Sequence, residues 1–164
     1  MSTVLRVRDL AVEFRAPEGV IRAVDGVSFV VPQGRTVALV GESGSGKTVV
    51  SQAIMRILPK AARIAGGEIL FFDPDSPGTF VDVTKLGVDS KEMRALRGGR
   101  ISIIFQEPMT SLSPLHTIGD QISETVLLHR RTSRAEAVKL TVEMLRLVGF
   151  AEPGQAVHTY PFEL

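Results

Sequence analysis

Alternation of apolar and polar residues marks the first part of the chain as rich in strands. Apolar residues partly alternate with charged ones over residues 4–14, and a second β-rich stretch covers residues 20–31. A period of two is typical of strands with one buried face. The turn signal at residues 32–34 precedes an uninterrupted apolar run, and residues 36–40 are therefore predicted to form a short buried strand.

The middle of the chain mixes strand and helix signals. Gly66-Gly67 opens one predicted strand, and Ser90 is a plausible helix cap before Gly98-Gly99 ends that helix. The predicted elements are a helix over 49–58 closed by Pro59, a strand at 68–72, a hairpin partner at 80–83, a short helix at 90–97 and a strand at 101–105.

The last part of the chain is helical from Thr117 onward. Its clearest helix covers residues 133–148 and is followed by Gly149, which suits a helix end. Two adjacent apolar rows are predicted on this helix: Val138, Val142, Leu145 and Val148 in one, and Leu140, Met144 and Leu147 in the other. Strands, then mixed elements, then helices predict an α/β protein with a separate helical lobe.

Composition narrows the class of protein. The 164 residues are 44% hydrophobic and 23% charged, as in an ordinary folded domain. With 19 basic and 18 acidic residues the net charge is +1, so no nucleic-acid partner is expected. The chain has no Cys, which excludes disulfides and thiolate metal sites. Its longest apolar runs are far shorter than the roughly 20 residues of a membrane-spanning helix.

The segment Gly41-Glu42-Ser43-Gly44-Ser45-Gly46-Lys47-Thr48 matches the phosphate-loop pattern GxxxxGK[ST]. Its glycines allow backbone N–H groups to turn toward phosphate oxygens, and the following helix adds unpaired N–H groups. Lys47 is predicted to bridge the β- and γ-phosphates, and the Thr48 hydroxyl to ligate Mg²⁺. A glycine-rich turn that binds nothing is the alternative. The chain contains no Asn, so it lacks the Asn-Lys-x-Asp element that reads guanine, which favours adenine.

Further segments resemble a known family. They are FQEPMTSL at 105–112, GDQI at 119–122, AVDGVSF at 23–29 and AIMRILP at 53–59. With GESGSGKT they closely resemble the ATP-binding subunits of ABC transporters, in the oligopeptide, dipeptide and nickel import branch. The resemblance covers nearly the whole chain. It implies a P-loop NTPase core with an N-terminal antiparallel β subdomain through residues 1–106, and the start of an α-helical subdomain at 107–164.

The resemblance also assigns roles to single residues. Gln106 matches the Q-loop glutamine, which contacts Mg²⁺ and the attacking water and links the site to the membrane helices. Phe14 matches the aromatic that stacks on adenine, although a simple core position is an open alternative. Met109, Leu112, Leu115 and Ile118 either contact the coupling helix of a permease or pack locally.

Several family motifs are missing from these 164 residues. The chain ends at the tyrosine-proline segment that precedes the Ser-Gly-Gly signature, and it has no Walker B aspartate, adjacent glutamate or switch histidine. Asp73 follows four apolar residues as a Walker B aspartate does, but Pro74 follows it and it precedes the Q-loop, so it is interpreted as a turn residue. Asp75-Ser76-Pro77-Gly78 is interpreted as a turn as well, and the three histidines are assigned no chemistry.

The predicted function follows from the resemblance. The parent protein is expected to be an ATPase subunit, with ATP and Mg²⁺, that energises import of peptides or similar small solutes. Expected partners are membrane permease subunits, a second ATP-binding subunit and, indirectly, a solute-binding protein. The expected location is the cytoplasmic side of the inner membrane, held through the permease. The chain alone is expected to bind Mg-ATP weakly and to hydrolyse almost none, because part of the catalytic set is missing.

Alternatives remain open at the level of sequence. One is a phosphate-loop ATPase of another class that has no permease. Another is a truncated, non-catalytic product. The chain also resembles the first half of a fused double ATPase, and its residues do not specify the transported solute.

Overall fold

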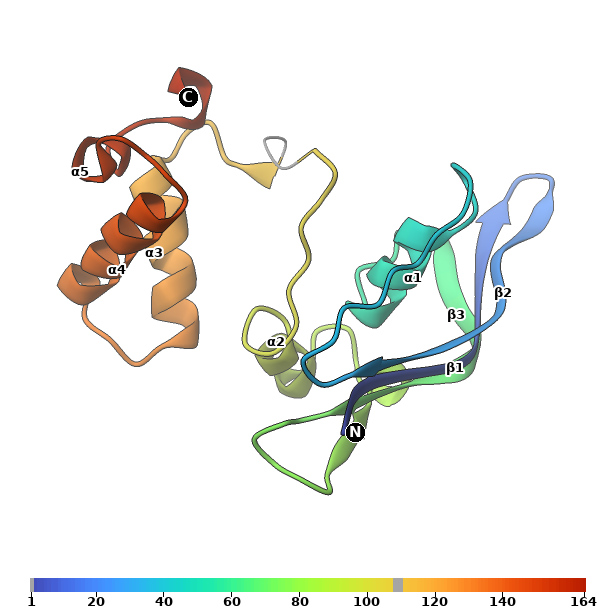
Figure 1. Ribbon diagram of the computed structural model, residues 1–164. Helices are drawn as coiled ribbons and strands as arrows, with labels where there is room; N and C mark the ends of the chain where they lie inside the picture. The colour runs from blue at the N-terminus through green and yellow to red at the C-terminus, as the bar shows by residue number, and fades with distance from the viewer. Residues whose placement is uncertain (1, 108–110) are drawn as a thin grey trace. The chain divides into compact units, whose positions relative to one another are not determined.

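A computed structural model describes residues 2–107 and 111–164 of the chain. The contacts divide it into two compact units, Met1–Ile103 and Ile104–Leu164. Their positions relative to each other are not determined (Figure 1), so each is described by itself. The first unit contains the sheet and the phosphate loop, and the second is helical.

The first unit is built on an antiparallel sheet of four strands in the order β2-β1-β3-β4. The strands are β1 (Thr3–Ala16), β2 (Gly19–Pro32), β3 (Ala62–Phe72) and β4 (Phe80–Asp82). β1 forms a long hairpin with β2 and also pairs with β3, as Figure 1 shows. The predicted β-rich stretches and the hairpin of β3 with β4 are confirmed.

A bulge bends β1 and β3 at the same level. Asp9 has φ 45° and Gly67 has φ 85°, both in the left-handed region, and the register shifts there. A Cβ at Gly67 would lie 2.5 Å from the Asp9 carbonyl oxygen, closer than any real Cβ contact. Only glycine lets the two backbones approach this closely.

The core of the first unit lies between the sheet and three short helical segments. These are α1 (Lys47–Ile54), η1 (Val83–Lys85) and α2 (Lys91–Leu96). The sheet contributes fully buried side chains such as Leu10 and Ile69, and the helical segments contribute Ala53, Val83 and Met93. Each fully buried large apolar side chain contributes about 1.5–3 kcal/mol, so this core holds α1 and the loop before it against the sheet.

Two predicted strands are absent from this part of the structure. Residues 36–40 and 102–105 belong to no strand, and Val40 and Ile104 are 86% and 91% exposed. Apart from one isolated bridge between Arg97 and Ile101, no described segment pairs with them. A strand is stabilised by hydrogen bonds to a neighbour, and these apolar runs have none within residues 2–107 and 111–164. The strand predictions are therefore wrong for the chain as it stands.

Helix α1 is shorter than predicted, because it ends at Ile54 rather than at Pro59. Arg56 adopts φ 53°, which no helix residue can have. The guanidinium of Arg97 fixes this end: Nε donates to the Met55 carbonyl at 2.9 Å, and Nη2 donates to the Arg56 carbonyl at 3.0 Å. A tertiary contact from Arg97, the residue that follows α2, therefore ends the helix before the proline does.

The second unit consists of two helices that pack against each other and two short turns of helix. They are α3 (Ile118–His129), α4 (Arg134–Leu147), α5 (Pro153–Ala156) and η3 (Pro161–Glu163). Ile118, Leu145 and Val157 form its core. Gly119 lies directly against the Val157 backbone, where a Cβ would not fit.

The buried face of α4 agrees only in part with the two predicted rows: Leu145 is buried and Val142 packs against the core, as predicted. The buried positions are Ala137, Thr141 and Leu145, whereas Leu147 and Val148 are 78% and 73% exposed. The Thr141 hydroxyl donates to the Ala137 carbonyl at 2.9 Å, so the polar group is satisfied inside the helix. Small residues allow close packing, and the sequence prediction overlooked them in favour of larger apolar ones.

Several single residues with an expected role have defined places in the structure. Leu112 packs against the second core and Ile118 is part of it, so these two pack locally, while Leu115 is 81% exposed. Met109 lies outside the described residues.

Asp73 accepts from the Asp75 amide at 3.0 Å in a turn, as interpreted from the sequence. None of the helices in residues 2–107 and 111–164 has the length and apolar character needed to cross a membrane.

A buried carboxylate makes the stability of the sheet depend on pH. Glu13 is 9% exposed and accepts from Arg22 Nη2 at 3.1 Å and Arg63 Nη2 at 2.8 Å. The hydrogen bond from Arg22 and the charges of both arginines lower the pKa of Glu13 below 4.5, although burial opposes this. Stability from this carboxylate is therefore fully present above pH 4.5 and is lost as the pH falls through the lower folded pKa.

Replacing Glu13 with Gln is expected to lower the melting temperature most at neutral pH. The difference from the unmodified chain should shrink below pH 4.5, since the wild-type carboxyl is then protonated as well. Thermal unfolding followed by circular dichroism between pH 7 and pH 3 measures this. Glu92→Gln, on the exposed face of α2, is the matched control. A Glu13→Gln difference that is constant across this range would contradict the expectation.

Candidate functional site

The site is built on the loop between the extended segment 35–40 and α1. Gly44 has φ 80° and Gly46 has φ 88°, both in the left-handed region that glycine adopts freely. These two glycines turn the chain tightly, and Gly46 is the residue that caps α1. The Ser45 amide donates to the Glu42 carbonyl at 3.2 Å, which closes one turn within the loop.

Gly46 also fixes the loop to the sheet. A Cβ at this position would lie 2.5 Å from the Ala23 carbonyl oxygen of β2, while one at Gly44 would meet nothing within 4 Å. The Val50 amide donates to the Gly46 carbonyl at 3.0 Å, which starts the helix. One glycine therefore allows both the left-handed turn and the contact with β2.

Lys47 folds back over the loop. Its Nζ donates to the carbonyls of Gly41 at 2.8 Å and Glu42 at 2.6 Å, and to the Ser45 Oγ at 3.2 Å. The ammonium group is thus held at the centre of the loop by three oxygen atoms. This positive charge is positioned to neutralise an anion bound in the loop.

The beginning of α1 differs from the beginnings of α2, α3 and α4. Those three helices have Ser90, Thr117 or Ser133 as the cap, and each hydroxyl accepts from a backbone amide. α1 has a glycine cap, no side-chain cap and no acidic residue in its first turn. Its first amides are therefore not used by a side-chain cap, and they carry the partial positive charge of a helix N-terminus. Together with Lys47, these features fit phosphate.

Thr48 is the candidate metal ligand. It is exposed in the first turn of α1. No group of three or more His, Cys, Asp or Glu side chains in the described part of the chain is arranged to hold a metal ion. The Thr48 hydroxyl is the loop oxygen that the phosphate-loop pattern assigns to Mg²⁺.

The two other predicted site residues come from segments outside the loop. Gln106 is exposed and belongs to the second unit, so its predicted place beside Lys47 stays a prediction. Phe14 is half-buried on β1 and packs against the first core. That contact agrees with the core alternative for Phe14, and its stacking role stays a prediction.

Arg97 contributes to the site without any sequence signal. Besides the two carbonyls at the end of α1, its Nη2 donates to the Val88 carbonyl at 2.9 Å. It therefore anchors the far end of the helix whose near end carries Lys47. Nothing in the spacing of residues around Arg97 distinguishes it from the exposed arginines nearby, so only the structure reveals it.

An extended segment, a loop with two left-handed glycines and an uncapped helix define a phosphate-loop α/β protein. The family model described as "ABC transporter" matches residues 24–160. The chain belongs to the ABC transporter family.

Curated relatives of the chain agree with this membership. It is 47% identical over 161 residues to the probable peptide ABC transporter ATP-binding protein y4tR of Sinorhizobium fredii. The aligned residues cover 98% of the chain and 45% of that relative. It is 44% identical to the dipeptide transport ATP-binding protein DppD of Bacillus subtilis, with 99% and 46% covered. The chain thus spans a little under half the length of these relatives.

Solved structures with the same fold include the bacterial ABC transporter cassette MJ0796. Its dimeric structure matches this chain with a TM-score of 0.78 at 22% sequence identity. The matched residues cover 98% of this chain and 62% of the cassette chain. A post-hydrolysis state of the same cassette, bound to ADP and Pi, has a TM-score of 0.75 at 20% identity. These likenesses confirm the predicted fold class.

Proposed function

We propose that the chain is the ATP-binding part of a subunit that energises ABC-type import of peptides or similar small solutes. The observation that carries the proposal is the loop at residues 41–48, where Lys47 is held centrally and the first amides of α1 have no side-chain cap. The names of the curated relatives, which are peptide and dipeptide transport ATP-binding proteins, support the cargo class.

The loop residues hold the phosphates in this proposal. Gly41, Glu42, Ser43, Gly44, Ser45 and Gly46 present backbone amides to phosphate oxygens, and Lys47 neutralises negative charge on them. Bound ATP supplies the phosphoryl group, and its oxygens complete the coordination of Mg²⁺. Thr48 and Gln106 are the proposed protein ligands on the metal. Phe14 is proposed to stack on adenine, and adenine fits better than guanine in a chain without Asn.

The domain division and the partners follow the same proposal. The core with its β subdomain covers residues 1–106, and the helical subdomain begins at 107, close to the division between the two compact units. The proposed partners are membrane permease subunits, a second ATP-binding subunit and, through the permease, a solute-binding protein. The proposed location is the cytoplasmic face of the membrane, where the permease holds the subunit.

Replacing Lys47 with Met is expected to weaken nucleotide binding at least tenfold. The change removes the ammonium that faces the phosphates, and hydrogen bonds to charged groups contribute about 1.5–3 kcal/mol. Titration of a fluorescent ATP analogue with Mg²⁺ measures the affinity. Lys139→Met, on the exposed face of α4, is the matched control. Equal affinity in both variants would refute the assignment of the site.

The 164 residues by themselves are expected to turn over almost no ATP. They contain no Walker B pair and no signature segment, so charge neutralisation and orientation of the attacking water are incomplete. Phosphate release by the pure chain is the measurement. Release that disappears in Lys47→Ala would show that these residues suffice, whereas activity seen only in a longer form of the protein supports the proposal.

A further inference from the structure

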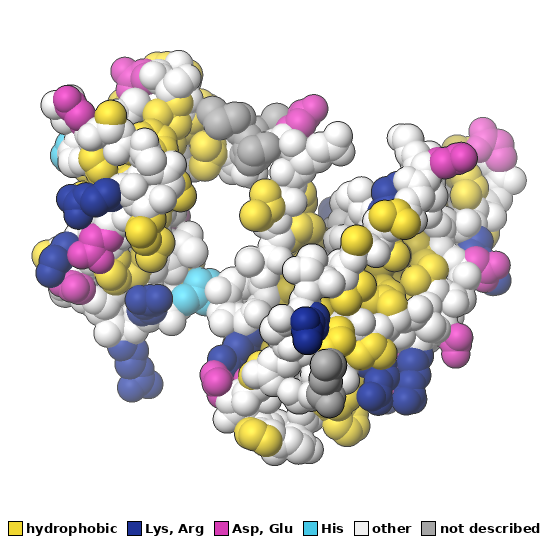
Figure 2. All heavy atoms as spheres, in the orientation of Figure 1, with side chains coloured by type: hydrophobic (Ala, Val, Ile, Leu, Met, Phe, Trp, Pro, Cys, Tyr) yellow, Lys and Arg dark blue, Asp and Glu magenta, His cyan; other side chains and the backbone are white. Residues whose placement is uncertain are grey.

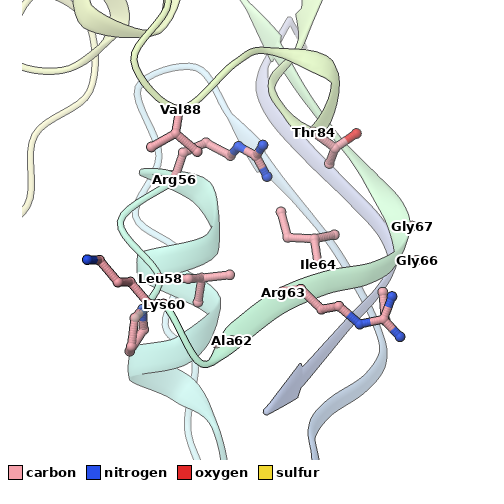
Figure 3. Close-up of a pocket in the computed structure, with 12 residues that line it drawn as sticks. Arg56, Leu58, Lys60, Ala62, Arg63, Ile64, Gly66, Gly67, Thr84 and Val88 are labelled. Carbon is pink, nitrogen blue, oxygen red and sulfur yellow. The ribbon is translucent and has the colours of Figure 1, made fainter. Parts of the chain in front are cut away.

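A cavity of about 660 Å³ lies in the first unit, at the far end of α1 from the phosphate loop. It is bounded by the chain after α1, by β3 and by the segment from η1 to α2 (Figure 3). Its apolar lining includes Leu58, Ile64 and Val88, and no Asp or Glu is among its lining residues. A volume of this size accommodates a small organic molecule.

Arg56 is the cation that points into this cavity. Figure 3 shows its guanidinium directed toward the middle of the ring of lining residues, whereas Lys60 and Arg63 extend outward from the rim. Its Nη2 donates to the Leu86 carbonyl at 3.1 Å. Its Nε is buried and has no hydrogen-bond partner, the one buried side-chain nitrogen or oxygen in this state among the described residues.

The backbone of Arg56 is strained as well. With φ 53° it is one of two described non-glycine residues in the left-handed region. A left-handed backbone costs a residue with a side chain about 1–2 kcal/mol. A strained residue with a buried, unpaired donor is unfavourable for the fold, and such residues are concentrated at functional sites.

Stabilisation of the helix end does not explain Arg56. Cations near the last turn of a helix are favourable because they pair with its free carbonyls. Here Arg97 already donates to the carbonyls of Met55 and Arg56. The guanidinium of Arg56 is therefore not needed at these carbonyls, and it points into the cavity instead.

The charges around the cavity favour an anion. Arg56, Lys60 and Arg63 line it, and of these three only Arg63 forms an ion pair within the described part of the chain, with Glu13 at 2.8 Å. We propose that the cavity binds a small anion with an apolar body, such as a carboxylate or phosphate monoester carrying a hydrocarbon group, with its anionic oxygens on Arg56. Ile54, the last residue of α1, follows Lys47 by seven residues, roughly 10 Å along the helix axis, and Arg56 comes after it in the chain, so this site is separate from the phosphate loop.

A tryptophan reporter tests the proposal. The chain has no Trp, and Val88 lines the cavity with 48% of its surface exposed, so Val88→Trp places the one indole beside the proposed ligand. Phenyl phosphate and phenylacetate are titrated separately at constant ionic strength. The expected result for at least one of them is a saturable fluorescence change with a Kd below about 1 mM. Inorganic phosphate and neutral benzyl alcohol should bind at least tenfold more weakly.

Two substitutions of Arg56, made in the same Val88→Trp chain, test whether its charge is needed for binding of the probe. Arg56→Gly and Arg56→Asn remove the charge and suit the left-handed backbone, so the fold should persist in circular dichroism. Each is expected to weaken binding at least tenfold. Arg94→Gln, exposed on α2, is the matched control, and Lys47→Met reports binding at the phosphate loop; both should leave the signal unchanged.

Each result decides the proposal. Saturable binding that depends on Arg56 supports it, and the probe that binds identifies a phosphate or a carboxylate as the preferred group. A non-saturable signal, or Arg56 variants that bind as tightly as the Val88→Trp chain, would overturn it. Loss of the signal in Lys47→Met, or binding of benzyl alcohol as tight as that of the anions, would overturn it as well.

Discussion

Gly46→Ala is expected to be among the most damaging single substitutions in the phosphate loop. An alanine at φ 88° costs about 1–2 kcal/mol for its conformation, and the overlap of its Cβ with a neighbour adds about 1–3 kcal/mol. The neighbour is the Ala23 carbonyl oxygen, 2.5 Å from the new Cβ. Because the overlap is between the loop and the backbone of β2, no side chain can move to relieve it, and the loop has to move away from β2. Loss of nucleotide binding and a lower melting temperature should appear together.

Gly44→Ala is the matched control for this prediction. Gly44 has nearly the same conformation, φ 80°, but its Cβ would meet nothing within 4 Å. Its expected cost is the conformational part alone, about 1–2 kcal/mol. Melting curves and nucleotide titrations of both variants separate the two contributions. Equal losses in Gly44→Ala and Gly46→Ala would show that contact with β2 does not hold the loop.

Gly67→Ala is expected to destabilise the sheet to a similar degree. Its Cβ would lie against the carbonyls of Arg8 and Asp9 at the shared bulge, and its φ of 85° adds conformational strain. The combined cost is about 2–5 kcal/mol. For a chain of this size, each kcal/mol lowers the melting temperature by about 2–4 °C.

Gly78 provides an unusually close comparison for Gly67. It has the same φ of 85° but open space around its Cβ, in the turn before β4. Gly78→Ala therefore carries the same conformational strain without the overlap. The melting temperature of Gly67→Ala should fall at least twice as far. If the two variants melt together, the close approach of β1 and β3 is not a source of stability.

Local sequence signals predicted much of the fold. Partial period-two alternation predicted β1, the β-rich stretch at 20–31 predicted β2, and the signal after Gly66-Gly67 predicted the second half of β3. Ser90 was predicted to cap α2, and the predicted start of the last long helix at Ser133 coincides with the cap of α4. These features depend on neighbours in the chain. The cap hydroxyls of Ser90 and Ser133, for example, accept from amides three residues later.

Features that depend on distant residues were not predictable in this way. The end of α1 is set by Arg97, which is 41 residues from Arg56. The apolar run at 36–40 has the composition of a buried strand, but a strand also requires a partner, and composition does not provide one. The buried face of α4 depends on which side packs closely, and Thr141 gave no apolar signal.

The candidate site likewise contains residues that are contiguous in the sequence and residues that come from distant elements. The phosphate loop is contiguous in sequence, so its pattern alone was sufficient to propose its glycines and Lys47 as one site. Gln106 and Phe14 come from other elements, and their places beside the loop depend on tertiary arrangement. Their roles were carried by the family resemblance alone, and both remain to be tested.

The folded-back position of Lys47 has a thermodynamic consequence for ligand binding. A long side chain that becomes fixed loses up to about 2 kcal/mol of rotamer entropy. In this chain Lys47 is already held by the carbonyls of Gly41 and Glu42, so that loss accompanies folding and not association. Binding of an anion then exchanges one set of oxygen partners for another, and the lysine contributes to affinity with little further ordering of its own side chain.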